Sequence, residues 1–201
     1  MKRLVIFGAG QQGRNCKRLA PLCGYEVVAF VDHIVVGEVE GVPVYSNAAK
    51  IPDFKDCYYI VAVGDLKVRK FFICVIEKYD LKCANLIDPT ADIEEGAVIG
   101  VGNYIYKFAS VYGSATIGNH NIINCKAVIA TDAVIGDNCD ICMGANICGD
   151  VHVGDNSYVG YNATVVSGYN VGRDACVKPG AVVYSDVEDG AVVGGVPAQH
   201  I

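Results

Sequence analysis

The chain has 201 residues, of which 52% are hydrophobic, and this is enough apolar side chain to bury a core. Its formal charge of -6 at pH 7 argues against a nucleic-acid partner, because a basic face is needed to neutralise phosphates. Charged residues or glycines interrupt every apolar stretch, so we expect no membrane span and a cytoplasmic protein. The ten cysteines are then expected to be reduced thiols.

The N-terminal part of the chain alternates between strand and helix patterns. Strands are predicted over 3–7, 27–31, 58–63 and 83–86, and helices from a glycine-rich turn to about residue 22 and over 66–79. Alternation of this kind is typical of a parallel sheet with helices packed on it. We therefore expect a small Rossmann-like α/β domain over residues 1–86.

A glycine-rich turn follows the first predicted strand and reads Gly8-Ala9-Gly10-Gln11-Gln12-Gly13. It fits the GxGxxG pattern, in which the missing side chains let backbone amides at a helix N-terminus approach a phosphate. Asp32 ends the next predicted strand, where an acid would bind a ribose hydroxyl. A tight turn with a surface aspartate is the alternative, and we favour nucleotide binding. A domain of about 86 residues supplies only half of a dinucleotide site, so a mononucleotide fits better than NAD.

The rest of the chain has a period of six. Isoleucine or valine occupies positions 87, 93, 99, 105, 111, 117, 123, 129, 135, 141, 147, 153, 159, 165, 171, 177 and 183, and alanine often lies two residues earlier. Helices repeat near 3.6 residues and strands at 2, so this period indicates short strands joined by turns. If three strands make one coil, residues about eighteen apart stack in neighbouring coils. We expect a parallel β-helix over 87–201.

The pattern [LIV]-G-x-x-x-x, as in Ile117-Gly118, Ile135-Gly136 and Val171-Gly172, resembles that of the hexapeptide-repeat acyltransferases. Together with the N-terminal domain, it makes the chain similar to the sialic acid O-acetyltransferase and bacillosamine-pathway UDP-sugar N-acetyltransferase family. The resemblance implies a left-handed β-helix and a homotrimer with active sites between subunits. It also implies acetyl transfer from acetyl-CoA to an amino or hydroxyl group of a nucleotide-linked sugar or sialic acid, without a metal.

The same resemblance implies where the substrates bind. Contacts to the nucleotide-linked sugar fall on Gly10, Gln11, Gln12, Gly13, Asp32, His33 and Gly64. Contacts to acetyl-CoA fall on Asp140, Gly149, Tyr161 and Pro179, although Asp140 stands where the family has a histidine. The ending over 194–201 resembles the family's GVPAK cap near the coenzyme's nucleotide, with Gln199 in place of the lysine.

The catalytic base is the main departure from the family, whose base is a histidine followed by an acid. Here Thr131 takes the histidine position and Asp132 keeps the acid. A threonine hydroxyl is not a base near neutral pH. His152, about one coil further on, is the better candidate for a replacement base, and His120, on the preceding face, is the second candidate. The alternative for each is an ordinary solvated loop residue. Gly149 should stack beneath Thr131 and donate its amide to the thioester oxygen.

Other interpretations remain open. An acceptor amine that is already nucleophilic would need little base. A catalytically silent relative would bind the nucleotide sugar and acyl-CoA without turnover. Zinc enzymes resembling the γ-class carbonic anhydrases need several histidine ligands, but the chain has four histidines without that spacing, and Cys139, Cys142 and Cys148 are not one coil apart. An NAD-binding regulator is ranked last.

Overall fold

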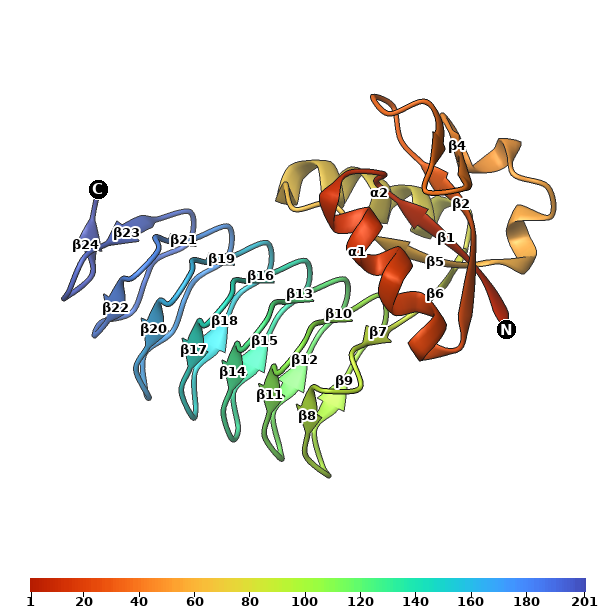
Figure 1. The fold of residues 1–201 in the computed structure, drawn as a ribbon. Coiled ribbons are helices and arrows are strands. Elements are labelled where there is room, and N and C mark those ends of the chain that lie inside the picture. The colour runs from red at the N-terminus through yellow and green to blue at the C-terminus, as the bar shows by residue number, and fades with distance from the viewer. The chain divides into compact units, whose positions relative to one another are not determined.

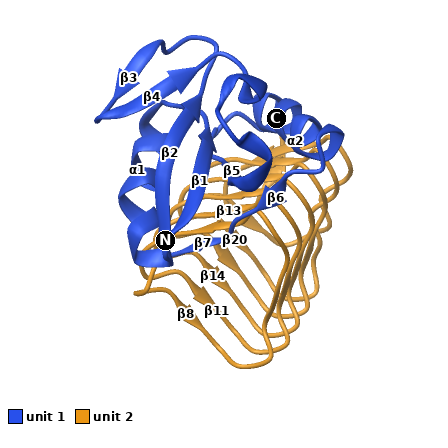
Figure 2. Cartoon of the chain, turned by 90° about the vertical axis from the view of Figure 1, so that its right-hand side faces the viewer, with its two compact units in different colours: residues 1–87 blue, residues 88–201 orange.

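The structure is a computed structural model that describes residues 1–201, which form two compact units, 1–87 and 88–201 (Figure 2). The first unit is a sheet with helices, and the second is a solenoid of short strands (Figure 1). Neither of the two α-helices combines the length and the hydrophobicity that a membrane crossing requires.

The first unit is built on a six-stranded sheet of order β3-β4-β2-β1-β5-β6, whose central strands run parallel. The strands are β1 (Lys2–Phe7), β2 (Tyr25–Val31), β3 (Gly37–Val39), β4 (Val42–Tyr45), β5 (Tyr58–Val61) and β6 (Lys82–Cys83), and β7 (Leu86–Ile87) ends the unit. The α-helices are α1 (Gln11–Leu19) and α2 (Leu66–Lys78), and the 3-10 turns are η1 (Ala20–Cys23), η2 (Ala48–Lys50) and η3 (Phe54–Asp56). Because β1 lies between β2 and β5, the strand order reverses beside β1. Parallel α/β sheets bind ligands at the carboxyl ends of the strands at such a point.

The predicted parallel α/β sheet is confirmed, and several elements differ from the prediction; for example, β2 begins at Tyr25 and β5 ends at Val61. The helix expected to reach residue 22 ends at Leu19, because Pro21 has no amide hydrogen with which to continue it, and the chain goes on as η1. The strand expected over 83–86 is interrupted, so that β6 ends at Cys83 and β7 begins at Leu86. The β3–β4 hairpin was not predicted, since strands of three and four residues carry little periodicity.

The second unit is a parallel β-helix of three sheets, as the period of six predicts. Its strands are β8 (Asp92–Ile93), β9 (Val98–Ile99), β10 (Tyr104–Ile105), β11 (Ser110–Val111), β12 (Thr116–Ile117), β13 (Ile122–Ile123), β14 (Val128–Ile129), β15 (Val134–Ile135), β16 (Asp140–Ile141), β17 (Asn146–Ile147), β18 (His152–Val153), β19 (Tyr158–Val159), β20 (Thr164–Val165), β21 (Cys176–Val177), β22 (Val182–Val183), β23 (Val192–Gly194) and β24 (Gln199–His200). Residues one coil apart pair, as Ile129 does with Ile147. The members of the six-residue series from Ile105 to Val183 are all buried, so they form the continuous interior of the solenoid.

Three columns of turns connect the sheets, and the second residue of most turns has a positive φ, for example 61° at Asp132, 57° at His120 and 53° at Asn162. Asp, Asn and Gly tolerate this conformation best, which explains why they recur there. We name each column after one residue. The Thr131 corner comprises 113–114, 131–132, 149–150 and 167–168; the Tyr161 corner comprises 107–108, 125–126, 143–144, 161–162 and 179–180; the His120 corner comprises 101–102, 119–120, 137–138, 155–156, 173–174 and 189–190.

Candidate active site

Each glycine of the turn between β1 and α1 has a different structural role. Gly8 has a φ of +99°, which turns the chain sharply after β1. A Cβ at Gly13 would lie 2.0 Å from the Gly8 carbonyl oxygen, so only glycine lets α1 pack this closely on the turn. A Cβ at Gly10 would meet nothing within 4 Å. Gly10 therefore leaves open space in front of α1, whose N-terminus has no side-chain cap and no acidic residue in its first turn.

Asp32 fastens this turn to the end of β2. Its Oδ2 accepts a hydrogen bond from the Ala9 amide at 2.8 Å, and its Oδ1 accepts from the amides of Ile34 at 2.8 Å and Val35 at 3.0 Å. Burial pushes the pKa of Asp32 upward, but these hydrogen bonds outweigh it and hold the pKa below its ordinary value. The ionised carboxylate thus joins two loops at the carboxyl edge of the sheet.

Gln11, Gln12 and Gly64 lie around the same edge. Gln11 is exposed on the first turn of α1, whereas the side-chain nitrogen of Gln12 is buried and has no hydrogen-bond acceptor. Gly64 follows β5, and a Cβ there would also meet nothing within 4 Å. The next residue, Asp65, caps α2 by accepting hydrogen bonds from the amides of Lys67 and Val68, both at 2.9 Å. The loops after β1, β2 and β5 thus form one edge, as their predicted roles require.

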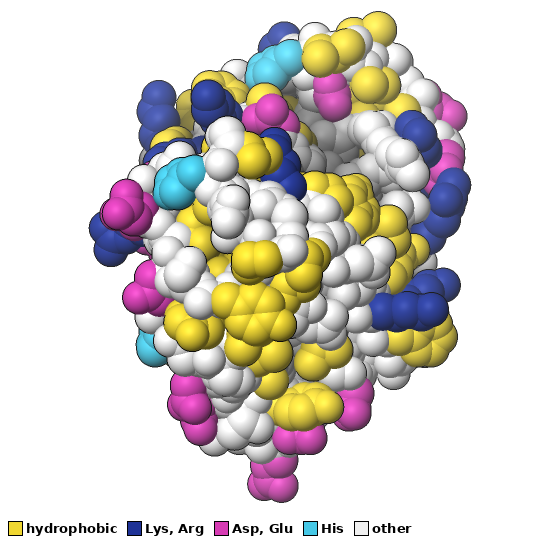
Figure 3. Space-filling view, turned by 90° about the vertical axis from the view of Figure 1, so that its left-hand side faces the viewer, with side chains coloured by type: hydrophobic (Ala, Val, Ile, Leu, Met, Phe, Trp, Pro, Cys, Tyr) yellow, Lys and Arg dark blue, Asp and Glu magenta, His cyan; other side chains and the backbone are white.

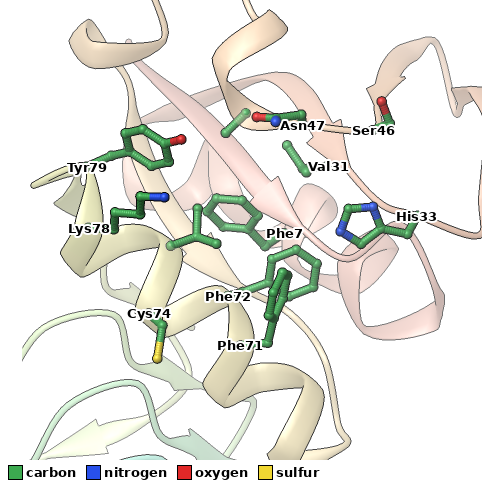
Figure 4. A pocket seen from close by; sticks show the side chains of 12 residues that line it. Phe7, Val31, His33, Ser46, Asn47, Phe71, Phe72, Cys74, Lys78 and Tyr79 are labelled. Atoms are coloured by element: carbon green, nitrogen blue, oxygen red, sulfur yellow. The ribbon is translucent and has the colours of Figure 1, made fainter.

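A cavity of about 310 Å³ lies between α2 and the segment after β4, and we call it the α2 groove (Figure 4). It is lined by Phe7, Val31, His33, Ser46, Asn47, Ala48, Phe71, Phe72, Cys74, Val75, Lys78 and Tyr79. The imidazole of His33 stacks on the Phe72 ring, with centroids 6.0 Å apart and planes 9° apart. Phe7 lies against the same ring at 4.9 Å. Sequence reasoning found His33 but missed the groove, because α2 and residues 46–48 are distant in the sequence.

Thr131, Asp132 and Gly149 come together at the Thr131 corner of the second unit. The Asp150 amide donates to the Thr131 carbonyl at 3.2 Å, and a Cβ at Gly149 would lie 3.1 Å from that same oxygen. Gly149 therefore stacks directly on Thr131. No protein group accepts a hydrogen bond from the Gly149 amide, which leaves this donor available. Both Thr131 and Asp132 are exposed, so the corner is open to solvent.

The two histidines of the coil lie away from this corner. His152 is exposed in β18, pairs with Val134 in the adjacent coil, and follows Gly149 by one turn and the start of a strand. His120 is only 9% exposed and belongs to a different corner. Its Nδ1 lies 2.3 Å from where a Cβ at Gly102 would be, so the ring fills the space above that glycine. His152 is therefore the nearer of the two to Thr131 along the fold.

Apart from Gly149, the residues expected to contact acetyl-CoA occupy other surfaces of the coil. Tyr161 is 44% exposed and Pro179 follows it one coil later in the Tyr161 corner, where the Gly180 amide donates to the Tyr161 carbonyl at 2.8 Å. Asp140 is buried on β16, with the Cys142 thiol 3.8 Å from its Oδ1. Within one chain, these residues do not meet Thr131.

The C-terminal end of the solenoid is closed by an antiparallel pair of strands. β23 pairs with β24 across a turn that contains a cis peptide bond between Val196 and Pro197. A cavity of about 290 Å³ lies beneath, lined by Val183, Ser185, Asp186, Val187, Val193, Ala198, Gln199 and His200. Apolar side chains gather on this end of the molecule (Figure 3), and Tyr184 and Ile201 are 53% and 75% exposed. The family-like ending thus forms a cap.

No group of three or more His, Cys, Asp or Glu side chains is placed to hold a metal ion. Cys139 and Cys142 are buried and Cys148 is partly buried, and all ten cysteines are free. The thiols of Cys139 and Cys142 contact oxygen atoms at 3.2 to 3.8 Å, so these side chains fill the coil.

Comparisons with known proteins find similarity over the whole length of the chain. Residues 3–76 match the family described as the PglD N-terminal domain. The acetyltransferase domain of PglB from Neisseria gonorrhoeae is 27% identical, with a TM-score of 0.93 and 100% of both chains covered. A perosamine N-acetyltransferase variant from Caulobacter crescentus, in complex with CoA and GDP-perosamine, is 27% identical with a TM-score of 0.94, covering 100% of this chain and 97% of that one.

The chain resembles the hexapeptide-repeat sugar N-acetyltransferases. WeeI from Acinetobacter baumannii shares the fold, with 24% identity, a TM-score of 0.90 and 100% of both chains covered. No curated protein matched the chain. The resemblance predicted from the sequence is confirmed, and so is the predicted class of enzyme, an acyl-CoA-dependent sugar acetyltransferase.

Proposed function

We propose that this protein transfers the acetyl group of acetyl-CoA to an amino group on a nucleotide-linked sugar. The observation that carries the proposal is the likeness of the whole chain to an N-acetyltransferase in complex with CoA and a GDP-linked amino sugar. The PglB domain, equally similar over its full length, has a structure in complex with acetyl coenzyme A. We place the enzyme in the cytoplasm, where acetyl-CoA and nucleotide sugars meet.

The first unit, a Rossmann-like domain over residues 1–86, would bind the nucleotide. Gly10, Gln11, Gln12 and Gly13 would hold the diphosphate, because the N-terminus of α1 presents free amides and a positive dipole end to the space that Gly10 leaves open. Asp32 would support nucleotide binding indirectly, by holding the glycine turn in position, since its carboxylate already accepts hydrogen bonds from three backbone amides.

His33 and Gly64 would complete the nucleotide site on either side of the turn. His33 faces the α2 groove, where the nucleobase would lie against aromatic rings. Gly64 leaves room above the end of β5, through which the sugar would extend. The three loops of the carboxyl edge would thus bind base, diphosphate and sugar in that order.

The second unit, a left-handed β-helix over residues 87–201, would carry out the transfer at the Thr131 corner. When the acceptor amine attacks the thioester carbonyl, a carbon–nitrogen bond forms and negative charge develops on the carbonyl oxygen. The carbon–sulfur bond then breaks, CoA leaves as the thiolate, and the proton lost by the amine balances the charge of that thiolate. The free amide of Gly149 would donate a hydrogen bond to that oxygen. Asp132 would stabilise the positive charge that develops on the amine nitrogen as it attacks, because its carboxylate lies at the same corner.

The reaction can proceed without a histidine at position 131 in one of two ways. His152 would accept the amine proton if it reaches the acceptor, and its imidazole is exposed to solvent. Otherwise the reaction would use the small neutral fraction of the amine, and its rate would rise with pH. The comparisons give no support to a catalytically silent relative. In both of the catalytic routes above, Thr131 would form a hydrogen bond with the acceptor.

A second copy of the chain would complete the site. The Thr131 corner is small and polar, whereas the Tyr161 corner carries exposed Met143 and Tyr161 and lies across a full sheet from it. Packing of one corner against the other, chain after chain, is a head-to-tail contact that closes into a ring. We propose a homotrimer in which Asp140, Tyr161 and Pro179 of one chain help to bind the acetyl-CoA that reacts at Thr131 of the next.

The test is acetyl transfer followed by mass spectrometry of the sugar. Thiol reagents are unsuitable for detecting released CoA, because the protein has free cysteines and Cys74 is exposed. The full chain is mixed with acetyl-CoA and a nucleotide-linked amino sugar, and the matching hydroxyl sugar is the control. An acetylated amino sugar supports the proposal, and acetylation of the hydroxyl sugar alone contradicts the choice of acceptor. No product from UDP-, GDP- or CMP-linked amino sugars refutes the proposed activity.

A further inference from the structure

We propose that the backbone amide of Thr131 binds an oxygen of the acceptor sugar, namely the hydroxyl on the ring carbon next to the reacting amine. This inference rests on the proposed acetyl transfer and goes beyond it, because it states which group beside the amine the enzyme recognises. The acceptor is then a vicinal amino alcohol whose hydroxyl oxygen accepts a hydrogen bond from the protein.

In the His120 corner, most amides of the first turn residue are satisfied by a side chain from the next coil. The Asn119 amide donates to Oδ1 of Asp137 at 2.6 Å, and the Asp137 amide donates to Oδ1 of Asp155 at 2.9 Å. Each of these acceptors comes from the residue eighteen positions later, which stacks on the donor. The amide of a first turn residue therefore points toward the space beside the first turn residue of the next coil.

The Thr131 corner lacks this acceptor. The residue one coil after Thr131 is Gly149, which has no side chain, and no protein group accepts a hydrogen bond from the Thr131 amide. A Cβ at Gly149 would meet only the Thr131 carbonyl oxygen within 4 Å, so the space beside this glycine is open. The Thr131 amide therefore faces open space where the His120 corner places a carboxylate.

A carboxylate already occupies the preceding amide of the same column. The Gly113 amide, one coil before Thr131, donates to Oε2 of Glu94 at 2.7 Å, and Glu94 is exposed. An amide of this corner thus binds an oxygen that approaches from outside the coil. The next two amides, of Thr131 and Gly149, have no protein acceptor. Two adjacent donors therefore remain for a ligand.

The two free amides serve two different oxygens. Residues one coil apart pair as parallel strands, so the two N–H bonds are nearly parallel and lie about 4.8 Å apart. Parallel donors at this spacing cannot both point at one oxygen, because a hydrogen bond weakens steeply when it bends. The Gly149 amide donates to the thioester oxygen in the proposed reaction. The Thr131 amide is then left for an atom of the acceptor.

An amino sugar carries a suitable oxygen close to its amine. The attacking nitrogen lies about 3–3.5 Å from the thioester carbon, which brings the neighbouring ring carbon and its hydroxyl to the adjacent coil. A hydrogen bond from the Thr131 amide to that hydroxyl oxygen fixes the direction from which the nitrogen attacks. A sugar without this hydroxyl loses both the bond and the orientation.

Acceptor specificity gives the first test. The full chain is incubated with acetyl-CoA and either the nucleotide-linked amino sugar that it acetylates or the same sugar without the neighbouring hydroxyl, and kcat/KM is measured by mass spectrometry. Thr131→Pro removes the amide hydrogen, whereas Thr131→Val keeps it, and both lose the threonine hydroxyl. We expect a preference of about ten-fold or more for the complete sugar in the unchanged protein and in Thr131→Val, and none in Thr131→Pro.

Proline fits the first position of such a turn. Pro179 holds this position in the Tyr161 corner, where the Ala181 amide closes the turn on the Lys178 carbonyl at 3.2 Å. The turn at Thr131 is closed in the same way, by the Ala133 amide at 3.1 Å from the carbonyl oxygen three residues earlier. Thermal unfolding of Thr131→Pro confirms that the variant is folded.

Isotopic labelling of threonine amides gives a second test that needs neither turnover nor Thr131→Pro. The chain has only four threonines, Thr90, Thr116, Thr131 and Thr164, so its labelled NMR spectrum is simple. Thr131→Val identifies the Thr131 signal by its absence. Binding of the complete sugar should move the amide proton of Thr131 downfield, as a new hydrogen bond does, and the sugar without the hydroxyl should not.

Equal use of both sugars by the unchanged protein would overturn the recognition of the neighbouring oxygen. A preference that Thr131→Pro retains, or a Thr131 signal that the complete sugar does not move, would overturn its assignment to this amide. Absence of any acetylated sugar would instead contradict the proposed function.

Discussion

The Oδ2 atom of Asp32 lies 2.8 Å from the Ala9 amide nitrogen, which ties the glycine turn after β1 to the end of β2. The other carboxylate oxygen holds the loop that follows β2 through the amides of Ile34 and Val35. One side chain therefore sets the positions of two loops at the edge where the strand order reverses. The shape of the proposed nucleotide site depends on a carboxylate that need not touch the nucleotide.

Asp32→Asn should weaken UDP binding by about ten-fold or more, because an asparagine has one acceptor oxygen for amides that now use two. Acetyl-CoA binding in the other unit should be unchanged. Comparison of UDP with 2′-deoxy-UDP separates this role from a ribose contact. We expect the same loss on removing the hydroxyl in the unchanged protein and in the variant, measured by calorimetry. A loss that vanishes in Asp32→Asn would mean that Asp32 binds the ribose directly.

Acid should remove the contribution of Asp32 to stability. Its pKa in the folded protein lies below the ordinary value, so the carboxylate stabilises the fold above its unfolded pKa, and this stabilisation is lost as pH falls through the folded pKa. At pH 7, the free energy of unfolding should be lower for Asp32→Asn than for the unchanged protein. The difference should shrink below about pH 4. A difference that grows on acidification would contradict the hydrogen-bonding pattern.

Gly10 and Gly13 should respond differently to alanine. A Cβ at Gly13 collides with the Gly8 carbonyl, so Gly13→Ala should lower the free energy of unfolding by roughly 1–3 kcal/mol. A Cβ at Gly10 meets no protein atom, so Gly10→Ala should fold normally but obstruct the diphosphate. Thermal unfolding and UDP titration of both variants check this pair. Normal UDP binding by Gly10→Ala would place the diphosphate elsewhere.

The sequence predicts the regular parts of this protein well and the groove poorly. The six-residue series predicts the coil because every repeat buries its own isoleucine or valine, such as Ile129 or Ile147, at a fixed interval. The glycine turn is also predictable, because its pattern lies within a few consecutive residues. The α2 groove is lined both by Phe72 of α2 and by Asn47, which are far apart in the sequence, and no short-range pattern predicts that they line one cavity. The position of His152 relative to Thr131 likewise required the turn geometry of the coil.

Thr131→His should raise the rate of acetyl transfer by about ten-fold or more near pH 7, because it places an imidazole beside Asp132 and the free Gly149 amide. The rate should also become less dependent on pH above about pH 7, where the new base is neutral. Thr131→Val is the matched control, since it keeps the branched shape without a base. An equal rate in both variants would mean that the acceptor amine lies away from this corner.

His152→Ala and His120→Ala should separate catalysis from stability. His152 is exposed, so its loss should leave thermal unfolding unchanged, and it should lower kcat with little effect on the KM for acetyl-CoA if it is the base. His120 is buried above Gly102, so its loss should destabilise the fold by roughly 1–2 kcal/mol. Turnover unchanged in His152→Ala, with a rate that rises steadily with pH, would assign the reaction to the neutral amine alone.

The most direct test of the account is the mass of a UDP-linked amino sugar after incubation with acetyl-CoA and the full chain. We predict the addition of a single acetyl group to the sugar nitrogen, and its loss in Gly10→Ala because the diphosphate no longer binds. An unmodified amino sugar, from a protein that binds both UDP and acetyl-CoA, would contradict the account and identify a protein that binds these ligands without transferring the acetyl group.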